Sequence, residues 1–182
     1  MSFEALSDWE LMALLAGDRE DAGEALEALV RRHQRALVNF FHRLGADGDG
    51  AQDCAQETFL HLFRYRDRYR PRAPFGSFLY TLARHAWTDW YRRRERQRAV
   101  TIEGQEERIS TEDEGRDDRL DLDAALRSLP EHLRWVVVLS VYQGLAHAEI
   151  AEVLEIPEGT VKSRMFHAVR KLREALHAGI DR

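Results

Sequence analysis

Residues 145–172 carry the clearest chemical signal in the chain, an apolar helical pattern followed by a turn and a basic helix. Ile150 and Val153 recur at helical spacing, and Pro157 is a residue type favoured in the first turn of the next helix. Beyond it, residues 160–173 contain five Lys or Arg and no Asp or Glu. A short helix with donors near its N-terminal end suits a DNA groove, so this stretch predicts a helix-turn-helix.

The second helix of this pair divides into an apolar stripe and a polar face. We expect the stripe to be buried, and it consists of Val161, Met165, Val169, Leu172 and Leu176. The remaining side chains can donate hydrogen bonds to phosphates and base edges. They are Thr160, Lys162, Ser163, Arg164, His167, Arg170 and Lys171. The alternative is an ordinary helical hairpin with a solvated basic face. It is disfavoured because a small residue (Ala151), a turn and a basic helix follow one another in the register of a helix-turn-helix.

A second group of candidate residues lies in segment 75–94, where aromatic side chains are interleaved with arginines. Aromatic rings can stack on unpaired bases while cations hold the backbone of the strand. The alternative is that these aromatics belong to the core or to a protein interface. The candidate nucleic-acid contacts, expected on the exposed side of a helix, are Tyr80, Arg84, His85 and Arg92.

The distribution of charge supports a nucleic-acid partner although the formal net charge is −5. Residues 1–63 sum to −7 and residues 64–98 to +8, whereas residues 103–123 sum to −7 and residues 124–182 to +1. Because DNA responds to a local basic patch rather than to the total charge, the acidic balance does not exclude DNA binding.

The hydrophobic periodicity predicts an all-α fold with two small helical domains joined by an acidic, flexible linker. The expected boundaries are 1–98, 99–121 and 122–182. In the first domain we expect four helices. The first is capped by Ser7 and Glu10 and stops at Gly17, and the second ends at Gly45. The third covers about 51–66, with Ala55, Phe59, Leu62 and Phe63 inward, and the fourth covers about 75–97. The second domain should contain a short helix before Pro130, a helix over 131–142 closed by Gly144, and the helix-turn-helix.

Several functional classes are disfavoured by what the sequence lacks. The single cysteine, Cys54, cannot form an internal disulfide and fits a reducing cytoplasm. The eight histidines are not spaced as metal ligands are. The sequence also has neither a phosphate-binding glycine loop nor a nucleophile elbow. We therefore expect that the protein is not an enzyme and binds no cofactor. With no basic leader and no long apolar run, we expect no signal peptide and no membrane insertion.

These motifs, in this order, resemble those of bacterial extracytoplasmic-function sigma factors, the minimal two-domain sigma class. Residues 53–59 resemble the family's segment for binding core RNA polymerase. Residues 78–85 resemble the helix that melts and reads the minus-ten promoter element. Residues 129–134 and 156–164 resemble the domain that reads the minus-thirty-five element.

The resemblance implies a sigma region 2 domain at 1–98 and a sigma region 4 domain at 122–182, acting with RNA polymerase core and promoter DNA in transcription initiation. It further implies an anti-sigma factor as a partner, and core contacts at Asp53, Gln56 and Glu57, whose spacing places them on one helix face. A one-component helix-turn-helix regulator that never engages core polymerase is the alternative. A third possibility, a protein-interaction adaptor, would not bind DNA.

Overall fold

The N-terminal part of the molecule is built from helices, as predicted. The computed structural model describes residues 3–17, 21–70, 74–101 and 118–180, and all secondary structure in these ranges is helical. The N-terminal elements are η1 (Phe3–Ala5), α1 (Asp8–Ala16), α2 (Ala22–Leu44), α3 (Gly48–Arg64), η2 (Arg66–Arg68) and α4 (Phe75–Thr101). None of the described helices is long and apolar enough to cross a membrane.

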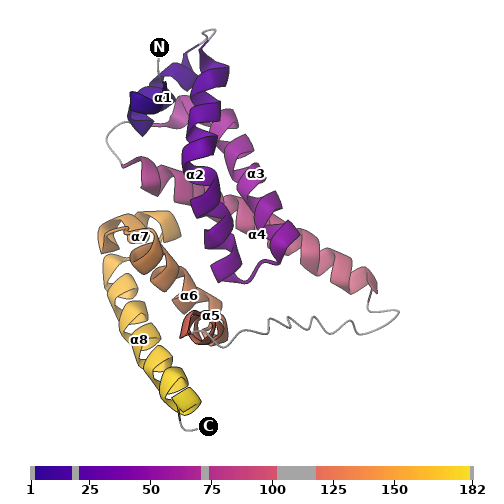
Figure 1. Ribbon diagram of the computed structural model, residues 1–182, viewed down its shortest axis with the longest axis vertical. Coiled ribbons are helices and arrows are strands. Elements are labelled where there is room, and N and C mark those ends of the chain that lie inside the picture. Colours follow the sequence, from indigo (N-terminus) through magenta and orange to yellow (C-terminus); the bar gives the residue numbers. More distant parts are fainter. Residues whose placement is uncertain (1–2, 18–20, 71–73, 102–117, 181–182) are drawn as a thin grey trace.

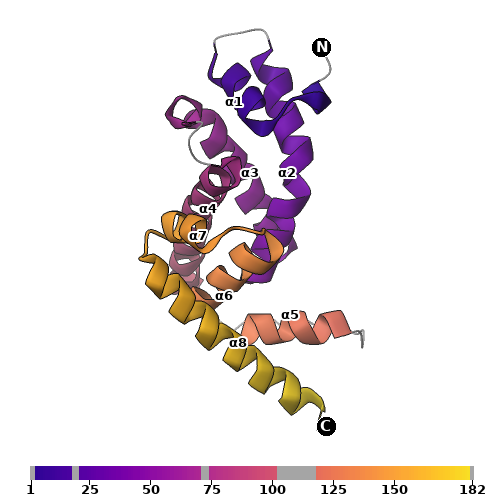
Figure 2. The ribbon, with the colours of Figure 1, turned by 90° about the vertical axis from the view of Figure 1, so that its left-hand side faces the viewer.

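The C-terminal part consists of shorter helices followed by one long helix. Its elements are α5 (Asp118–Ser128), α6 (Glu131–Val137), the π-helical turn η3 (Val138–Tyr142), α7 (His147–Leu154) and α8 (Glu158–Ile180). The predicted linker 99–121 lies mainly outside the described residues, and helical structure extends into both of its ends. Figures 1 and 2 show α6 and α7 beside α2 and α4, while α8 leads away from α7 towards the C-terminus.

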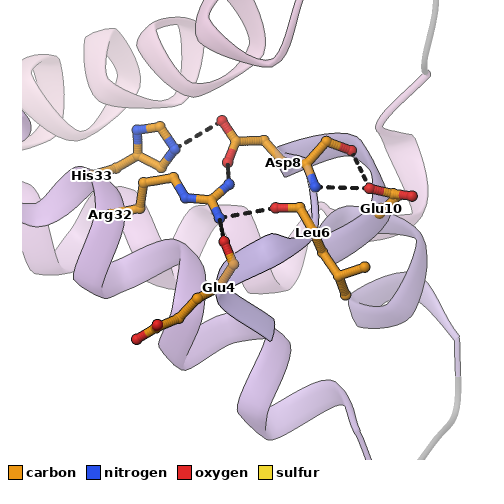
Figure 3. Close-up of polar contacts among 7 residues, drawn as sticks. Glu4, Leu6, Asp8, Glu10, Arg32 and His33 are labelled. Atoms are coloured by element: carbon orange, nitrogen blue, oxygen red, sulfur yellow. Dashed lines mark hydrogen bonds and ion pairs between the residues drawn. The ribbon is translucent and has the colours of Figure 1, made fainter. Parts of the chain in front are cut away.

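Polar side chains hold the first helix in place. The carboxylate of Glu10 accepts hydrogen bonds from the backbone N–H of Ser7 at 2.8 Å and from its hydroxyl at 2.6 Å, which confirms the predicted cap. One residue along, Asp8 accepts from the guanidinium of Arg32, and its second oxygen lies 3.0 Å from Nε2 of His33 (Figure 3). Asp8 therefore ties the start of α1 to the middle of α2.

Two helix boundaries follow from local chemistry between α2 and α3. Gly45 ends α2 with a φ of 109°, a left-handed conformation that glycine adopts without strain, as predicted. Asp47 then caps α3, because its Oδ1 accepts a hydrogen bond from the backbone N–H of Gly50 at 2.8 Å. The third helix consequently begins at Gly48, three residues before the predicted start at Ala51.

The buried stripes of two helices differ in detail from the prediction. In α3, Phe63 is 44% exposed rather than inward, and the guanidinium of Arg66 lies over its ring at 4.4 Å. In α8, Val169 and Leu176 are exposed. The inward stripe of α8 instead follows a different register: Val161, Met165, Ala168 and Leu172.

Side chains from both halves of the chain form one continuous core. The ring of Phe40 on α2 lies 5.3 Å from that of Trp135 on α6, and the guanidinium of Arg43 lies 4.0 Å from the ring of Tyr142. Nη1 of Arg134 donates to the carbonyl oxygen of Leu44 at 2.6 Å, and so satisfies an end carbonyl of α2. The C-terminal half is therefore packed against the N-terminal half, and α4 contacts both α3 and α7.

The close approach of α3 to α4 requires a glycine at position 50. A Cβ atom there would lie 2.6 Å from Cζ2 of Trp90 and 2.7 Å from Oδ1 of Asp47. The indole of Trp90 has little freedom to move away, because it stacks on Trp87 with ring centroids 5.1 Å apart. By contrast, a Cβ at Gly48 would meet nothing within 4 Å.

We therefore expect Gly50→Ala to lower the free energy of unfolding by about 1–3 kcal/mol, the usual cost of overpacking. Gly48→Ala, in the same helical turn, is the matched control and should stabilise the fold by about 0.4–1 kcal/mol. Urea unfolding followed by circular dichroism measures both. Equal stability of the two variants would contradict the proposed clash.

Candidate nucleic-acid interface

The predicted helix-turn-helix is formed by α7, a tight turn and α8. Ile150 and Val153 of α7 are fully buried, and the residue that follows the helix, Glu155, has a left-handed φ of 54°. The turn closes when the backbone N–H of Ile156 donates to the carbonyl of Ala151 at 3.0 Å. These contacts set the angle at which α8 leaves the domain.

The polar face of α8 is open to solvent. Five of the seven predicted contact residues are exposed, while Thr160 and Arg164 are half-buried. Lys162 pairs with Glu158 at 2.8 Å and Arg170 with Glu174 at 3.8 Å, and a hydrogen bond from Lys162 holds the pKa of Glu158 below its ordinary value. Such exposed pairs contribute little to stability, so both cations can exchange their carboxylates for phosphates at small cost. The exposed members are Lys162, Ser163, His167, Arg170 and Lys171.

Phe166 belongs to the same open face and is not among the seven contact residues predicted from the sequence. Its side chain is 68% exposed, and its ring lies 5.7 Å from the imidazole of His167. An aromatic residue on a solvated basic face is available for apolar contact with the methyl group of thymine. The sequence already indicated this exposure, because Phe166 does not belong to the predicted buried stripe of α8.

On α4, the predicted exposure of Tyr80 is wrong. The side chain is 5% exposed, its ring lies 4.9 Å from that of Phe40, and its hydroxyl donates to the amide oxygen of Gln143. The burial also raises the pKa of Tyr80. The physical reason is that the C-terminal domain covers this part of α4, which the sequence pattern of one helix cannot reveal.

The other predicted residues of α4 are more accessible. Nη2 of Arg84 pairs with Oε1 of Glu155 at 2.6 Å, and the arginine side chain retains 23% exposure. His85 is exposed, and its pKa lies below the ordinary value, first because of partial burial and then because of the neighbouring charge of Arg84. Arg92 is exposed two turns further along the helix. The four predicted residues thus follow one helix but differ in how far they reach solvent.

The predicted core contacts line a hollow beside α3. Asp53 and Gln56 are exposed, whereas Glu57 is half-buried and its Oε1 lies 3.2 Å from Nε2 of His61. The hollow encloses about 530 Å³. Leu60, which is 55% exposed, continues the same face and was missed, although its spacing of three and four residues from Glu57 and Gln56 was visible in the sequence. We call this surface the α3 hollow: Asp53, Gln56, Glu57, Leu60, Trp90 and Arg93.

The described residues contain no group of three His, Cys, Asp or Glu side chains that could hold a metal ion. The groups on these surfaces can form hydrogen bonds, ion pairs and stacking contacts. The surfaces are an open basic face on α8, a partly covered face of α4, and a mixed polar and apolar hollow beside α3.

Comparison with known proteins identifies both halves of the chain. Residues 29–97 match the model of Sigma-70 region 2, and residues 119–172 match that of Sigma-70, region 4. The ECF RNA polymerase sigma factor SigL of Mycobacterium tuberculosis is 36% identical over 171 residues, covering 91% of this chain and 96% of SigL. SigE of Mycolicibacterium smegmatis is 35% identical over 157 residues, which cover 82% of this chain and 61% of that longer protein.

The fold is likewise that of a solved structure. The structure of CnrH in complex with the cytosolic domain of CnrY superimposes with a TM-score of 0.70 and 26% identity, covering 94% of this chain and 97% of CnrH. With both regions matched in order and SigL aligned over nearly its full length, the chain belongs to the ECF family of bacterial RNA polymerase sigma factors.

Proposed function

We propose that this protein is an alternative sigma factor that binds RNA polymerase core, recognises the minus-ten and minus-thirty-five promoter elements and initiates transcription. The observation that carries the proposal is the presence of a region 2 and a region 4 in one chain, each with a solvent-accessible binding surface. The protein acts as a specificity subunit in the cytoplasm and is not an enzyme. A one-component regulator is not favoured, because it has no need of region 2.

The α3 hollow is the proposed docking surface for core polymerase. It combines exposed acceptors at Asp53 and Gln56 with the apolar side chain of Leu60 and the cation of Arg93. A surface of this kind can form hydrogen bonds around an apolar centre, the usual arrangement of a protein–protein interface. Its position beside α3 agrees with the family resemblance of residues 53–59.

The open face of α8 is the proposed reader of the minus-thirty-five element. Lys162, Ser163 and Arg164 lie in its first two turns, where a recognition helix reaches base edges. Arg170 and Lys171 lie one to two turns further on and suit phosphates. Phe166 adds an apolar contact between these two groups.

The accessible side of α4, with Arg84, His85 and Arg92, is the proposed contact for the minus-ten element. Stacking of a base on an aromatic ring such as the imidazole of His85 is worth about 1–3 kcal/mol per base, comparable to the cost of disrupting one base pair. This face can therefore hold an opened base but cannot melt an extended duplex alone, so the polymerase must supply the remainder.

We also propose an anti-sigma factor as a regulatory partner. The family resemblance implies one, and CnrH was solved with the cytosolic domain of a second protein, CnrY. The α3 hollow and the exposed basic face of α8 are the surfaces that such a partner would have to cover in order to block core binding and promoter binding.

The decisive experiment is reconstitution of a holoenzyme. Purified protein mixed with sigma-free core should give specific run-off transcripts from a promoter library, and Gln56→Ala with Glu57→Lys should weaken core association by about tenfold or more, or about 1.4 kcal/mol. The same exchanges at exposed positions of α2, Gln34→Ala with Glu24→Lys, are the matched control. Wild-type core affinity in the first variant would remove the α3 hollow as docking surface, and no run-off from the wild type would remove the sigma function.

For the minus-thirty-five element, we expect Arg164→Ala and Phe166→Ala each to weaken binding by about 1–3 kcal/mol and to relax sequence preference, because they remove contacts to bases. Lys171→Ala should weaken all sequences alike and lower the salt slope by about one, because it removes a phosphate contact. Fluorescence anisotropy with selected and scrambled duplexes over a salt series measures both effects. Uniform loss in Arg164→Ala would reassign that residue to the phosphates.

For promoter opening, Arg84→Ala should impair open-complex formation on duplex promoters more than on templates with a pre-melted bubble. The bubble already provides the unpaired strand that Arg84 would help to retain. Arg96→Ala, which removes the same charge from an exposed position of α4, is the control and should affect both templates little. Permanganate footprinting reports the open strand, and equal defects of Arg84→Ala on both templates would indicate a role in docking or folding instead.

A further inference from the structure

One buried histidine of α3 contacts a side chain that lines the α3 hollow. His61 is 6% exposed, and Nε2 of its imidazole lies 3.2 Å from Oε1 of Glu57, which precedes it by one helical turn. An ionised carboxylate can only accept hydrogen bonds, so Nε2 carries a proton and donates it to Glu57. The contact therefore runs from a buried donor to an acceptor that reaches the hollow.

The fold itself does not need an imidazole at this position. Nδ1 of His61 is buried, and it has no hydrogen-bond partner among the described residues. A buried polar atom without a partner costs free energy, whereas a leucine of similar volume would bury no such atom. The histidine is therefore unfavourable for the core, and its contact with Glu57 is the interaction that can explain its presence.

The imidazole ring is packed on the side away from Glu57. The ring of Tyr65, one turn further along α3, lies with its centroid 6.0 Å from that of His61, and the guanidinium of Arg68 lies 4.8 Å from the centroid of the tyrosine ring. Glu57, His61 and Tyr65 are four residues apart, so they share one face of the helix. A donor that is buried and packed in this way has little freedom to turn, and it can fix the acceptor that it meets.

Glu57 is left with one oxygen held and one oxygen available. Its side chain is 26% exposed, and its carboxylate makes no other hydrogen bond within the part of the chain that the structure describes. A glutamate side chain is long and flexible, and immobilising it at an interface weakens binding. Because His61 already holds Oε1, the second oxygen is presented to a partner in a defined place.

We infer that His61 is a positioning residue for core polymerase, which acts through Glu57 by holding its carboxylate in the orientation that the polymerase meets. The inference rests on the proposed function, because it takes Glu57 as part of the docking surface. The imidazole is buried and need not touch the polymerase itself. Its effect should appear in the affinity for core and not in the stability of the fold.

Two substitutions at one position separate positioning from packing. His61→Leu removes the donor at similar volume, whereas His61→Gln supplies an amide N–H that can again donate to Glu57. His33→Leu is the matched control, because it removes another histidine–carboxylate contact, between Nε2 of His33 and Asp8 at 3.0 Å, and neither residue lines the α3 hollow. The full-length variants are titrated with sigma-free core to obtain dissociation constants, and they are unfolded in urea.

His61→Leu should weaken core association about three- to tenfold, the range expected when a flexible side chain must be immobilised on binding. Its urea midpoint should stay at or above that of the wild type, because the unpartnered Nδ1 is gone. His61→Gln should restore most of the affinity, and His33→Leu should bind core as the wild type does. Wild-type core affinity in His61→Leu would overturn the inference, and so would parallel losses of affinity and stability in both His61 variants.

A double-mutant cycle with Glu57→Ala tests whether His61 acts through the carboxylate. In the Glu57→Ala background, His61→Leu should cause no further loss of core affinity. A loss of the same size in both backgrounds would overturn the inference and leave the α3 hollow as the docking surface. Wild-type core affinity in Glu57→Ala would instead remove Glu57 from that surface and the positioning role with it, while run-off transcription by the wild type decides the sigma function independently.

Discussion

Helix α4 is the element on which the rest of the structure depends, because its buried polar side chains need hydrogen-bond acceptors from other parts of the chain. Tyr80 and Trp87 are almost fully buried, and a buried hydroxyl or indole N–H without an acceptor costs free energy. In this structure Gln143 and Glu131 supply the acceptors. The position of the whole C-terminal domain is therefore coupled to the hydrogen bonds of a single helix.

The charge pattern has a structural meaning as well as a functional one. One cation of the basic segment 64–98, Arg84, is paired across the domain boundary with Glu155 of the C-terminal domain. The basic face of α8 is treated differently, since its nearest carboxylates, Glu158 and Glu174, lie on its own exposed surface. One candidate DNA surface is thus partly covered by another domain, while the other remains open to solvent.

The sequence predicted elements whose causes are local, and failed where the cause was distant. Gly45 and the Ser7–Glu10 cap were recognisable because a helix end is determined by neighbouring residues. The exposure of Tyr80 could not be predicted, because the side chain is covered by residues more than sixty positions away. Val169 was assigned to the wrong face because helical spacing allows two registers, and only contact with neighbouring helices selects Ala168 instead. The assignments of individual residues to core polymerase or DNA remain predictions.

The seam between the domains combines an apolar centre with a polar margin, and this composition determines how easily it can open. Phe40 against Trp135 supplies apolar contact, but the contacts at the margin are weak: Ser77 and Glu149 are 3.4 Å apart, and the side chain of Glu155 is 69% exposed. An exposed ion pair contributes about 0–1 kcal/mol, and a net hydrogen bond about 0.5–1.5 kcal/mol. Polar seams of this type resemble transient interfaces between domains. The apolar contact at the centre therefore contributes more to holding the two halves together than the polar contacts at the margin do.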